Sequence, residues 1–246
     1  MNYYVVVVLV SLLIGLSKGG LGGPVPISLI TPLLSQFIPV SNAVGVVLPV
    51  LMVADVFALR VYWREWDMRY IRLLLPMTIV GILVGTWVLA SLPDIALRRI
   101  LGALTLIAVS YKVASARLTA LAYQPREWHG HVVGAASGFG SALANAGAPP
   151  FTAYMLLQNI PPKTFIGTTT LFFAIVNALK LPGYLQTGAL NLQQFIGIAW
   201  SLPILPLGVW AGRKIINRMN PAIFEWMMIV ALVWVSLNLL FTAPAR

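Results

Sequence analysis

Residues 15–26 read GLSKGGLGGPVP and interrupt an apolar run with one lysine, five glycines and two prolines. Glycines end a helix and let the backbone turn tightly, and a proline such as Pro24 or Pro26 suits the first turn of the next helix. The apolar segment before this break, residues 4–17, has fourteen residues. A helix of that length covers about 21 Å of a hydrocarbon core roughly 30 Å thick. The stretch therefore predicts two short helices that meet inside a membrane.

The composition of the whole chain supports a membrane location. Of its 246 residues, 59% are hydrophobic and 9% are charged, whereas soluble domains have roughly 25% charged residues. Four stretches carry no charge over 20 to 32 residues, namely residues 73–93, 132–162, 181–212 and 226–245. Roughly 20 apolar residues suffice to cross a bilayer as a helix, and strands of a membrane barrel would alternate apolar and polar residues instead. We therefore expect an all-α polytopic membrane protein.

The apolar residues fall into ten segments of uneven length with short connections between them. The segments are residues 4–17, 24–38, 42–62, 70–92, 96–113, 131–144, 148–159, 163–184, 192–213 and 221–241. The first one lacks the basic region and the cleavage site of a signal peptide, so we expect it to remain in the mature protein. The absence of cysteine excludes disulfides, thiolate nucleophiles and metals bound by thiolates.

The distribution of cations predicts the orientation of the chain. If the segments alternate sides, eleven Lys and Arg residues lie on one face and three on the other. The eleven are Arg60, Arg64, Arg69, Arg72, Lys112, Arg117, Arg126, Lys163, Arg213, Lys214 and Arg218; the three are Arg98, Arg99 and Arg246. By the positive-inside rule the first face is cytoplasmic and both termini are outside. The net charge of +10 is then explained mostly by the excess of cations on the cytoplasmic face, and we expect no nucleic-acid partner.

The chain also contains an internal repeat. Glycines and prolines recur in the same order 122 to 128 residues apart: Gly15 with Gly138, Pro26 with Pro149, Pro39 with Pro161, Gly45 with Gly167, Pro76 with Pro203, Gly81 with Gly208, Gly85 with Gly212 and Pro93 with Pro221. We therefore divide the chain into a first repeat (residues 1–113), a cytoplasmic linker (114–129) and a second repeat (130–246). A chance similarity between two apolar halves is the alternative, and the shared order of the pairs argues against it.

The two repeats are predicted to be inverted. Each half has two short segments followed by three long ones, and the charge count gives the halves opposite orientations. The predicted fold is thus two inverted repeats, each with a short broken helix pair plus three full transmembrane helices. Whether the short pairs are re-entrant or half-spanning stays open. Inverted repeats with short interrupted segments at matching positions are typical of secondary transporters, whose binding site lies near the bilayer midplane.

Both breaks favour an anion as the ligand. The second half repeats the break as ANAGAPPF at residues 144–151, so two helix N-termini with free amides point into the membrane from opposite sides. Lys18 lies at the first break, and Lys180 lies in NALKLPGY at residues 177–184. A lysine within a membrane segment costs about 2.5 kcal/mol or more and marks a functional candidate. The alternative is that either side chain snorkels to an interface.

Polar residues near the breaks complete the candidate site. Asp55 lies inside an apolar segment, with Asn177 as its repeat counterpart; its carboxylate could carry a coupling proton or could neutralise a lysine, and both alternatives stay open. Asn145 and the hydroxyl run of Thr168, Thr169 and Thr170 could donate hydrogen bonds to a substrate oxygen, or the threonines could cap helices and link them. The predicted substrate-binding residues are Lys18, Gly19, Gly20, Gly22, Gly23, Asn145, Gly147, Thr168, Asn177 and Lys180. We expect no metal and no cofactor.

Six motifs make the chain resemble the TauE/SafE sulfite exporter family over essentially its whole length. They are GLSKGGLGG (15–23), LPVLMVAD (48–55), LPMTIVGILVG (75–85), ALANAGAPP (142–150), FIGTTTLFFAIVNALKLPGY (165–184) and LPILPLGVWAG (202–212). Where many members are glycine-rich in both halves, this chain has SALANAG at residues 141–147. The resemblance implies transport of a small sulfur-containing anion, such as sulfite, an organosulfonate or a similar oxyanion. It further implies export across a bacterial cytoplasmic (inner) membrane, with alternating access from one repeat rocking against the other.

Two other classes of function stay open at the level of sequence. One is an anion channel. The other is a membrane-embedded enzyme acting on a lipid-linked substrate, which would need acids, histidines or metal ligands gathered at one membrane face; the sequence offers only scattered acids. We therefore expect a transporter and not an enzyme, with a small anionic substrate and membrane lipid as partners. The oligomeric state is left open.

Overall fold

The computed structural model describes residues 3–18, 25–118, 126–158, 160–190, 192–216 and 221–241. Within these ranges the chain forms eleven α-helices and no strand, as the long apolar segments predict. The helices are α1 (Tyr3–Lys18), α2 (Val25–Leu34), α3 (Val40–Val61), α4 (Met68–Ser91), α5 (Asp94–Leu118), α6 (Glu127–Ala144), α7 (Ala148–Leu156), α8 (Pro162–Gln186), α9 (Leu192–Ala199), α10 (Ile204–Ile216) and α11 (Pro221–Phe241).

The helix boundaries depart from the predicted segments in two places. Residues 192–213 form two helices, α9 and α10, with a turn at residues 200–203 between them, so the prediction of one long helix there is wrong. Pro203 lies in this turn, and a proline removes a backbone donor and clashes with the helical turn before it. The connection between the halves is also shorter than the predicted linker 114–129, because α5 continues to Leu118 and α6 already begins at Glu127.

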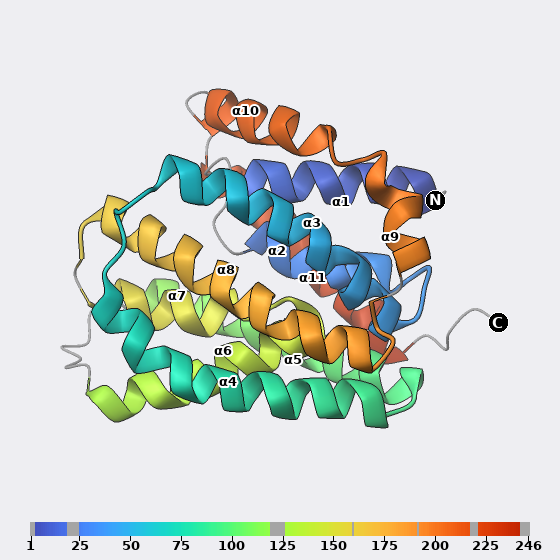
Figure 1. Ribbon diagram of the computed structural model, residues 1–246, viewed down its shortest axis with the longest axis horizontal. Helices are drawn as coiled ribbons and strands as arrows, with labels where there is room; N and C mark the ends of the chain where they lie inside the picture. Colours follow the sequence, from blue (N-terminus) through green and yellow to red (C-terminus); the bar gives the residue numbers. More distant parts are fainter. Residues whose placement is uncertain are drawn as a thin grey trace.

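The two short helix pairs enter the molecule from opposite ends. In Figure 1, α1 begins and α2 ends towards the right-hand end, whereas α6 begins and α7 ends towards the left-hand end. Each pair therefore turns back inside the molecule and leaves at the end where it entered. The start of α1 and the end of α11 lie at the same end of the molecule.

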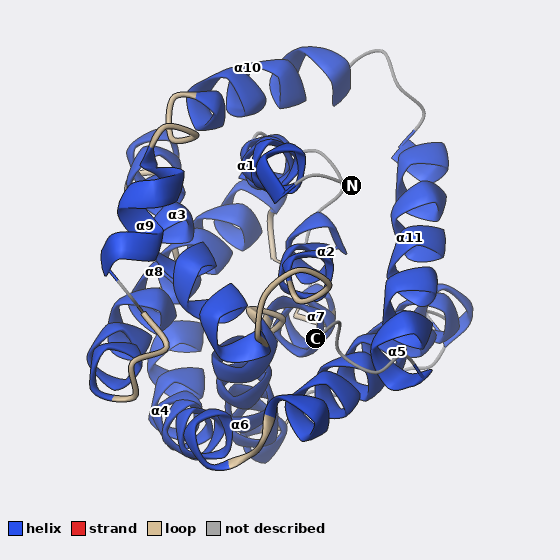
Figure 2. Ribbon diagram, turned by 90° about the vertical axis from the view of Figure 1, so that its right-hand side faces the viewer, coloured by secondary structure: helices blue, strands red, loops and turns tan. Residues whose placement is uncertain are grey.

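Helices from the early part of the chain pack mainly on helices from the late part. The closest partners are α4 with α6, α1 with α10, α5 with α11, and α3 with α8. Figure 2 shows α1, α2 and α7 in the middle of this view, with the other helices around them. This arrangement brings the inner ends of both short pairs, α1–α2 and α6–α7, to the middle of the molecule.

Glycines allow two of these helix pairs to touch backbone to backbone. A methyl group added to Gly15 of α1 would lie 2.8 Å from the Cα atom of Gly208 in α10. At the contact of α4 with α6, a methyl group on Gly81 would lie 2.2 Å from the carbonyl oxygen of Ala135, and one on Gly138 would lie 2.2 Å from that of Thr78. Small residues permit this close approach, which is a common way for helices to associate in membranes.

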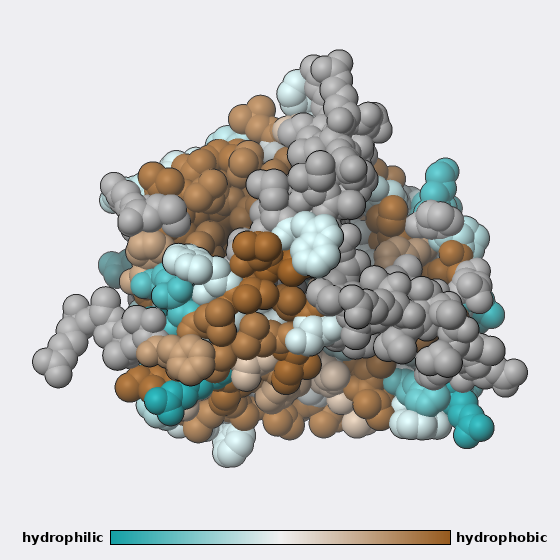
Figure 3. Space-filling view, turned by 180° about the vertical axis from the view of Figure 1, so that it is seen from behind, coloured by the Kyte–Doolittle hydropathy of each residue, from teal (hydrophilic) through white to brown (hydrophobic). Residues whose placement is uncertain are grey.

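The outer surface is suited to lipid. Three helices within the described ranges are long and apolar enough to cross a membrane: Val40–Val61, Met68–Ser91 and Lys163–Gln186. Large apolar side chains such as Leu83 and Trp87 are exposed. Figure 3 shows a mostly hydrophobic middle on one face, with hydrophilic residues towards its left and right edges. These features are those of a membrane protein, because a soluble protein rarely exposes so large an apolar area.

Candidate functional site

A cavity of about 440 Å³ lies where the two short helix pairs meet. Ile27 of α2 and Ala148 of α7 both border it, so the first turns of these two helices face one space. The end of α1, the end of α6, α3 and α8 supply the rest of the wall. The two sequence breaks, far apart along the chain, thus come together at a single cavity.

Lys18 and Asp55 form an ion pair beside this cavity. Lys18 is the last residue of α1, where the negative end of the helix dipole favours a cation, and its ammonium group donates a hydrogen bond to Asp55 on α3. The second carboxylate oxygen of Asp55 accepts a hydrogen bond of 2.6 Å from the side-chain amide of Asn177 on α8. Asp55 is only 2% exposed. Lys18 and Asn177 line the cavity, and the carboxylate lies behind them.

Lys180 has different partners. Its ammonium group donates hydrogen bonds to the side-chain oxygen of Asn145 at 2.7 Å and to the carbonyl oxygen of Ser141 at 3.3 Å. Asn145 in turn donates to the hydroxyl oxygen of Thr31 at 3.2 Å. Asn145 lines the cavity, whereas Lys180 lies behind it and is completely buried. The side chain of Lys180 therefore does not snorkel to an interface.

Asn145 adopts a backbone conformation that few residues accept. It caps α6 in the left-handed region, with φ 53° and ψ 23°, where asparagine is tolerated better than other residues with a side chain. Ser141, one turn earlier in α6, offers its carbonyl oxygen to Lys180. The end of α6 thus presents both a carbonyl and an amide oxygen to the same ammonium group.

The charges of Lys18, Lys180 and Asp55, which together form the charge cluster, do not cancel. None of the ion pairs among the described residues involves Lys180. The described part of the cluster has two lysines, Lys18 and Lys180, and one carboxylate, Asp55, so it carries one net positive charge when all three are ionised. A buried charge is costly unless it is paired. An anion in the cavity would supply the missing negative charge.

The structure does not place three groups of predicted site residues at the cavity. Gly19, Gly20, Gly22 and Gly23 lie outside the described residues. Gly147 does not line the cavity; its carbonyl oxygen accepts a hydrogen bond of 2.7 Å from Ser137, and a methyl group on it would lie 2.3 Å from the carbonyl oxygen of Ser137. The glycine is therefore needed to pack α7 against α6.

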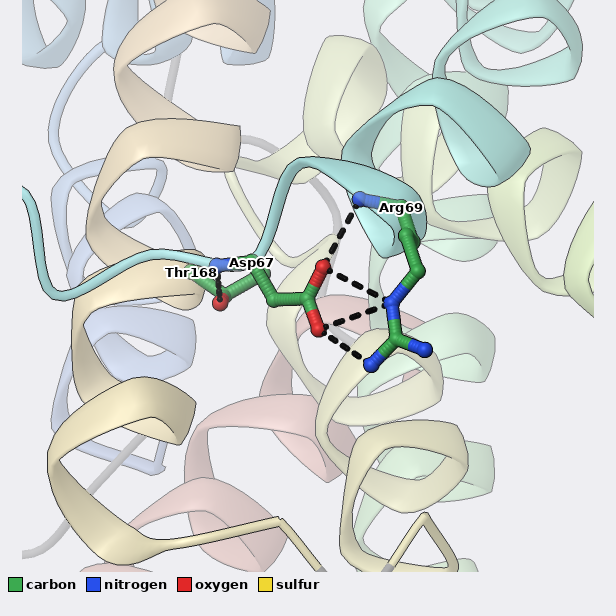
Figure 4. A network of polar contacts seen from close by, with 3 residues as sticks. All are labelled: Asp67, Arg69 and Thr168. Atoms are coloured by element: carbon green, nitrogen blue, oxygen red, sulfur yellow. Dashed lines mark hydrogen bonds and ion pairs between the residues drawn. The ribbon is translucent and has the colours of Figure 1, made fainter.

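Thr168 is also absent from the cavity wall. It is completely buried, and its hydroxyl oxygen accepts a hydrogen bond of 2.9 Å from the backbone N–H of Asp67 (Figure 4). This contact ties α8 to the loop that precedes α4. Of the three threonines named as possible donors, Thr169 and Thr170 line the cavity, and Thr168 does not.

The loop residue Asp67 has a structural role near the start of α8. Its carboxylate caps α4 by accepting a hydrogen bond from the backbone N–H of Arg69 at 2.9 Å, and it also pairs with the Arg69 guanidinium group at 2.7 Å (Figure 4). The hydrogen bond from this guanidinium group is the main reason why the pKa of Asp67 is lowered from its ordinary value of 3.8.

Several polar residues at the site were not predicted. Thr31 accepts from Asn145, and Ser17 and Thr152 line the cavity. Ser17 could have been found as the neighbour of Lys18 at the first break. No local pattern distinguishes Thr31 or Thr152 from other threonines in apolar helices. Within the described ranges, no group of three or more His, Cys, Asp and Glu residues could hold a metal ion.

One of the comparisons with known proteins gave a match. A family model described as Sulfite exporter TauE/SafE matches residues 7–239, which is nearly the whole chain. The comparisons with curated proteins and with solved structures gave no match. The match covers both short helix pairs, the two lysines and Asp55. The chain therefore belongs to the TauE/SafE sulfite exporter family of membrane transporters.

Proposed function

We propose that the protein is a secondary transporter that moves a small sulfur-containing anion, such as sulfite, an organosulfonate or a similar oxyanion, through the cavity. The observation that carries the proposal is the uncompensated positive charge of Lys18, Lys180 and Asp55 beside a cavity bordered by two helix N-termini. The positive end of the helix dipole at those termini favours an anion in the same place.

The pair of Lys18 and Asp55 suggests how an anion and a proton could be coupled. An anion that reaches Lys18 competes with Asp55 for the same ammonium group. If the carboxylate takes up a proton, it loses its charge, and Lys18 becomes available to the substrate. Asn177 can hold the carboxyl group in place in either state, because it already contacts its second oxygen. We infer that Asp55 carries the coupling proton.

The pattern of helix contacts supports two inverted repeats. In the sequence repeat, α1 corresponds to α6, α2 to α7, α4 to α10 and α5 to α11. The contact of α1 with α10 therefore has its counterpart in that of α6 with α4, and the contact of α2 with α11 has its counterpart in that of α7 with α5. The glycines of the first two contacts, Gly15 with Gly208 and Gly138 with Gly81, are also counterparts in the sequence repeat. Alternating access by rocking of one repeat against the other fits this pattern.

The direction of transport is proposed from the shape of the cavity. It extends from Lys18 and Asn177 to Tyr62 and Phe165, at the end of α3 and the start of α8. This end of the molecule carries Lys163 and other cations of the face that the positive-inside rule assigns to the cytoplasm. A cavity that reaches the cytoplasmic side is ready to load a substrate for export from a bacterial cell, with both termini outside.

Flux measurements in proteoliposomes test the proposal. The purified protein should release labelled sulfite or organosulfonate at a saturable rate, and unlabelled anion on the opposite side should accelerate the release. An imposed pH gradient should change the rate if a proton is coupled. Flux that does not saturate and ignores both gradients would identify a channel, and the absence of flux for every sulfur-containing anion would reject the proposed substrate class.

A further inference from the structure

The cavity reaches towards one end of the molecule only. It extends to Tyr62 and Phe165, where α3 ends and α8 begins. The opposite end, where α3 begins and α8 ends, is the outer end of the molecule (Figure 1). A methyl group added to Gly45 of α3 would lie 1.9 Å from the carbonyl oxygen of Ala189, just after α8. The backbones of the two segments therefore touch at the outer end.

The sequence repeat pairs residues of the cavity wall with residues near the outer end. Within α3 and α8 the offset is 122 residues, as for Gly45 with Gly167, and within α2 and α7 it is 123, as for Pro26 with Pro149. Four such pairs are Tyr62 with Tyr184, Ile166 with Val44, Thr170 with Leu48, and Thr152 with Leu29. The first member of each pair lines the cavity. All four second members are at most 4% exposed and belong to one buried apolar cluster.

The pairing depends on which side of a helix a residue occupies. Val50 lies two residues after Leu48, so it points about 200° away from it around α3. Val50 packs in a different buried cluster, and its counterpart in α8, Phe172, does not line the cavity. One side of α3 is thus closed where the same side of α8 is open.

Tyr184 holds the outer cluster together with a hydrogen bond. Its hydroxyl group donates to the carbonyl oxygen of Ala142 at 2.6 Å, which ties the end of α8 to α6. The side chain is completely buried. Its counterpart Tyr62 borders the cavity and is only partly buried. The two tyrosines therefore occupy equivalent places in the repeats, one in a closed half and the other in an open half.

A second tie keeps the outer end closed. Asp94, the first residue of α5, accepts a hydrogen bond of 2.7 Å from the backbone N–H of Val40 at the start of α3. Arg98 pairs with Asp94 at 2.5 Å and donates to the carbonyl oxygen of Ile38 at 3.4 Å. The counterpart of Val40 at the start of α8 is Pro162, which has no backbone N–H. The cytoplasmic end cannot form the same tie, so the tie favours the state in which the outer end is closed.

We propose that Leu29, Val44, Leu48 and Tyr184 form an outer gate, and that opening this gate creates an outward-facing cavity lined by these four residues. The inference rests on the proposed function, because it assigns residues to the two sides of an alternating-access cycle. Tyr62, Thr152, Ile166 and Thr170 form the cytoplasmic gate, which is open in this structure. When the outer gate opens, these residues close into a buried cluster.

Labelling of single cysteines tests the inference directly, because the chain contains no cysteine of its own. The probe is a membrane-impermeant maleimide applied to right-side-out and inside-out membrane vesicles. Thr170→Cys should react in inside-out vesicles, and Leu48→Cys should react in right-side-out vesicles although Leu48 is buried in this structure. Val50→Cys is the matched control on α3 and should react in neither.

Two further substitutions should release the outer gate. Tyr184→Phe removes the hydroxyl group that contacts Ala142, and a hydrogen bond of this kind changes an equilibrium by about fivefold. The outer labelling rate of Leu48→Cys should therefore rise by about that factor. Asp94→Ala removes the cap on α3 and should raise the same rate by about fivefold as well. Tyr70→Phe is the control, since Tyr70 lies near the start of α4 and does not line the cavity.

The outcomes separate this inference from the proposed function. The inference is overturned if Leu48→Cys reacts no faster than Val50→Cys even in the Tyr184→Phe protein, or if both releasing substitutions act like Tyr70→Phe. Saturable anion flux in the same vesicles would then leave the transporter standing. If flux does not saturate, and Leu48→Cys and Thr170→Cys both react rapidly at once, the protein is a channel, and the proposed function fails together with the inference.

Discussion

Lys18 and Lys180 serve one cavity but differ in what surrounds them. Lys18 lines the cavity and pairs with a carboxylate, Asp55. Lys180 is completely buried behind Asn145 and meets only uncharged oxygens among the described residues. Because Lys18 contacts the cavity, its ammonium group can exchange Asp55 for another anion. Lys180 is enclosed and cannot leave its partners.

The difference suggests that the two lysines have different roles in transport. The ammonium group of Lys18 can be shared between Asp55 and a substrate, so the anion that it contacts can change during transport. Lys180 lies close to the cavity and fixes the amide of Asn145, which also donates to Thr31. Electrostatic attraction acts at longer range inside a protein than in water, because the effective dielectric constant is lower.

The largest effect is expected when Lys18 is removed. Lys18→Gln leaves the Asp55 carboxylate buried without its cation, which typically costs about 3–5 kcal/mol, and it removes the group that contacts the anion. Flux in proteoliposomes should fall by about 100-fold or more, where each factor of ten in rate corresponds to 1.36 kcal/mol of activation free energy. Lys163→Gln, at an exposed lysine of α8, is the control. A folded Lys18→Gln protein with full flux would show that this lysine has no part in transport.

Removing the carboxylate should have the opposite effect on binding. Asp55→Asn keeps the shape of the side chain and frees Lys18, so the anion should bind about tenfold tighter because its competitor has lost its charge. Turnover should fall, and the flux should lose its dependence on a pH gradient. Calorimetry and flux assays on the same protein check both parts. A variant whose flux still follows the pH gradient would exclude Asp55 as the proton carrier.

Neutralising the enclosed lysine should have a smaller effect. Lys180→Met has a similar length and no charge, and it removes both hydrogen bonds of the ammonium group, to Asn145 and to Ser141. A buried acceptor left unsatisfied costs about 1–3 kcal/mol, and anion affinity should fall by roughly tenfold because the net positive charge is gone. The variant should stay folded. If its affinity equals that of the wild type, the charge of Lys180 does not act on the cavity.

The next variants separate the side chain of Asn145 from its backbone. Asn145→Gly accepts the left-handed conformation but breaks the link between Lys180 and Thr31. Asn145→Ala breaks the same link and adds about 1–2 kcal/mol of backbone strain. Thermal unfolding should therefore rank glycine above alanine, while both lower anion affinity by the same few-fold factor. Equal stability of the two variants would argue against a strained cap at this position.

The smallest effect is expected at Asp67, whose ion pair lies outside the charge cluster. Asp67→Asn can still cap α4 but loses its pairing with Arg69. Because the folded pKa of Asp67 is lowered from 3.8, the ion pair stabilises the wild type fully above about pH 4 and loses this contribution as pH falls through the lowered value. The difference in melting temperature between the two proteins should be small at neutral pH and vanish in acid, with no change in flux.

The predicted site residues that lie at or beside the cavity are those that conflict with a membrane. The break at residues 15–26, both lysines and Asp55 are all costly in lipid, and each of them lies at the cavity or contacts a residue that lines it, within the described ranges. Such residues can be recognised without a structure, because their surroundings in the sequence are apolar.

Residues whose role depends on direction could not be predicted in the same way. Successive residues of a helix point about 100° apart, so the GTTT motif presents its threonines to different neighbours. Thr168 contacts the loop before α4, while Thr169 and Thr170 line the cavity. The break between α9 and α10 was missed because Pro203 lies in a charge-free run in which other prolines are accommodated within helices, such as Pro206 in α10.

The glycine contacts determine which helices can move together. With no side chain between Gly15 and Gly208, or between α4 and α6 at Gly81 and Gly138, the paired backbones interlock and cannot slide without first separating. Each of these two contacts joins a helix of the first repeat to a helix of the second. The proposed rocking of one repeat against the other would therefore have to open both contacts.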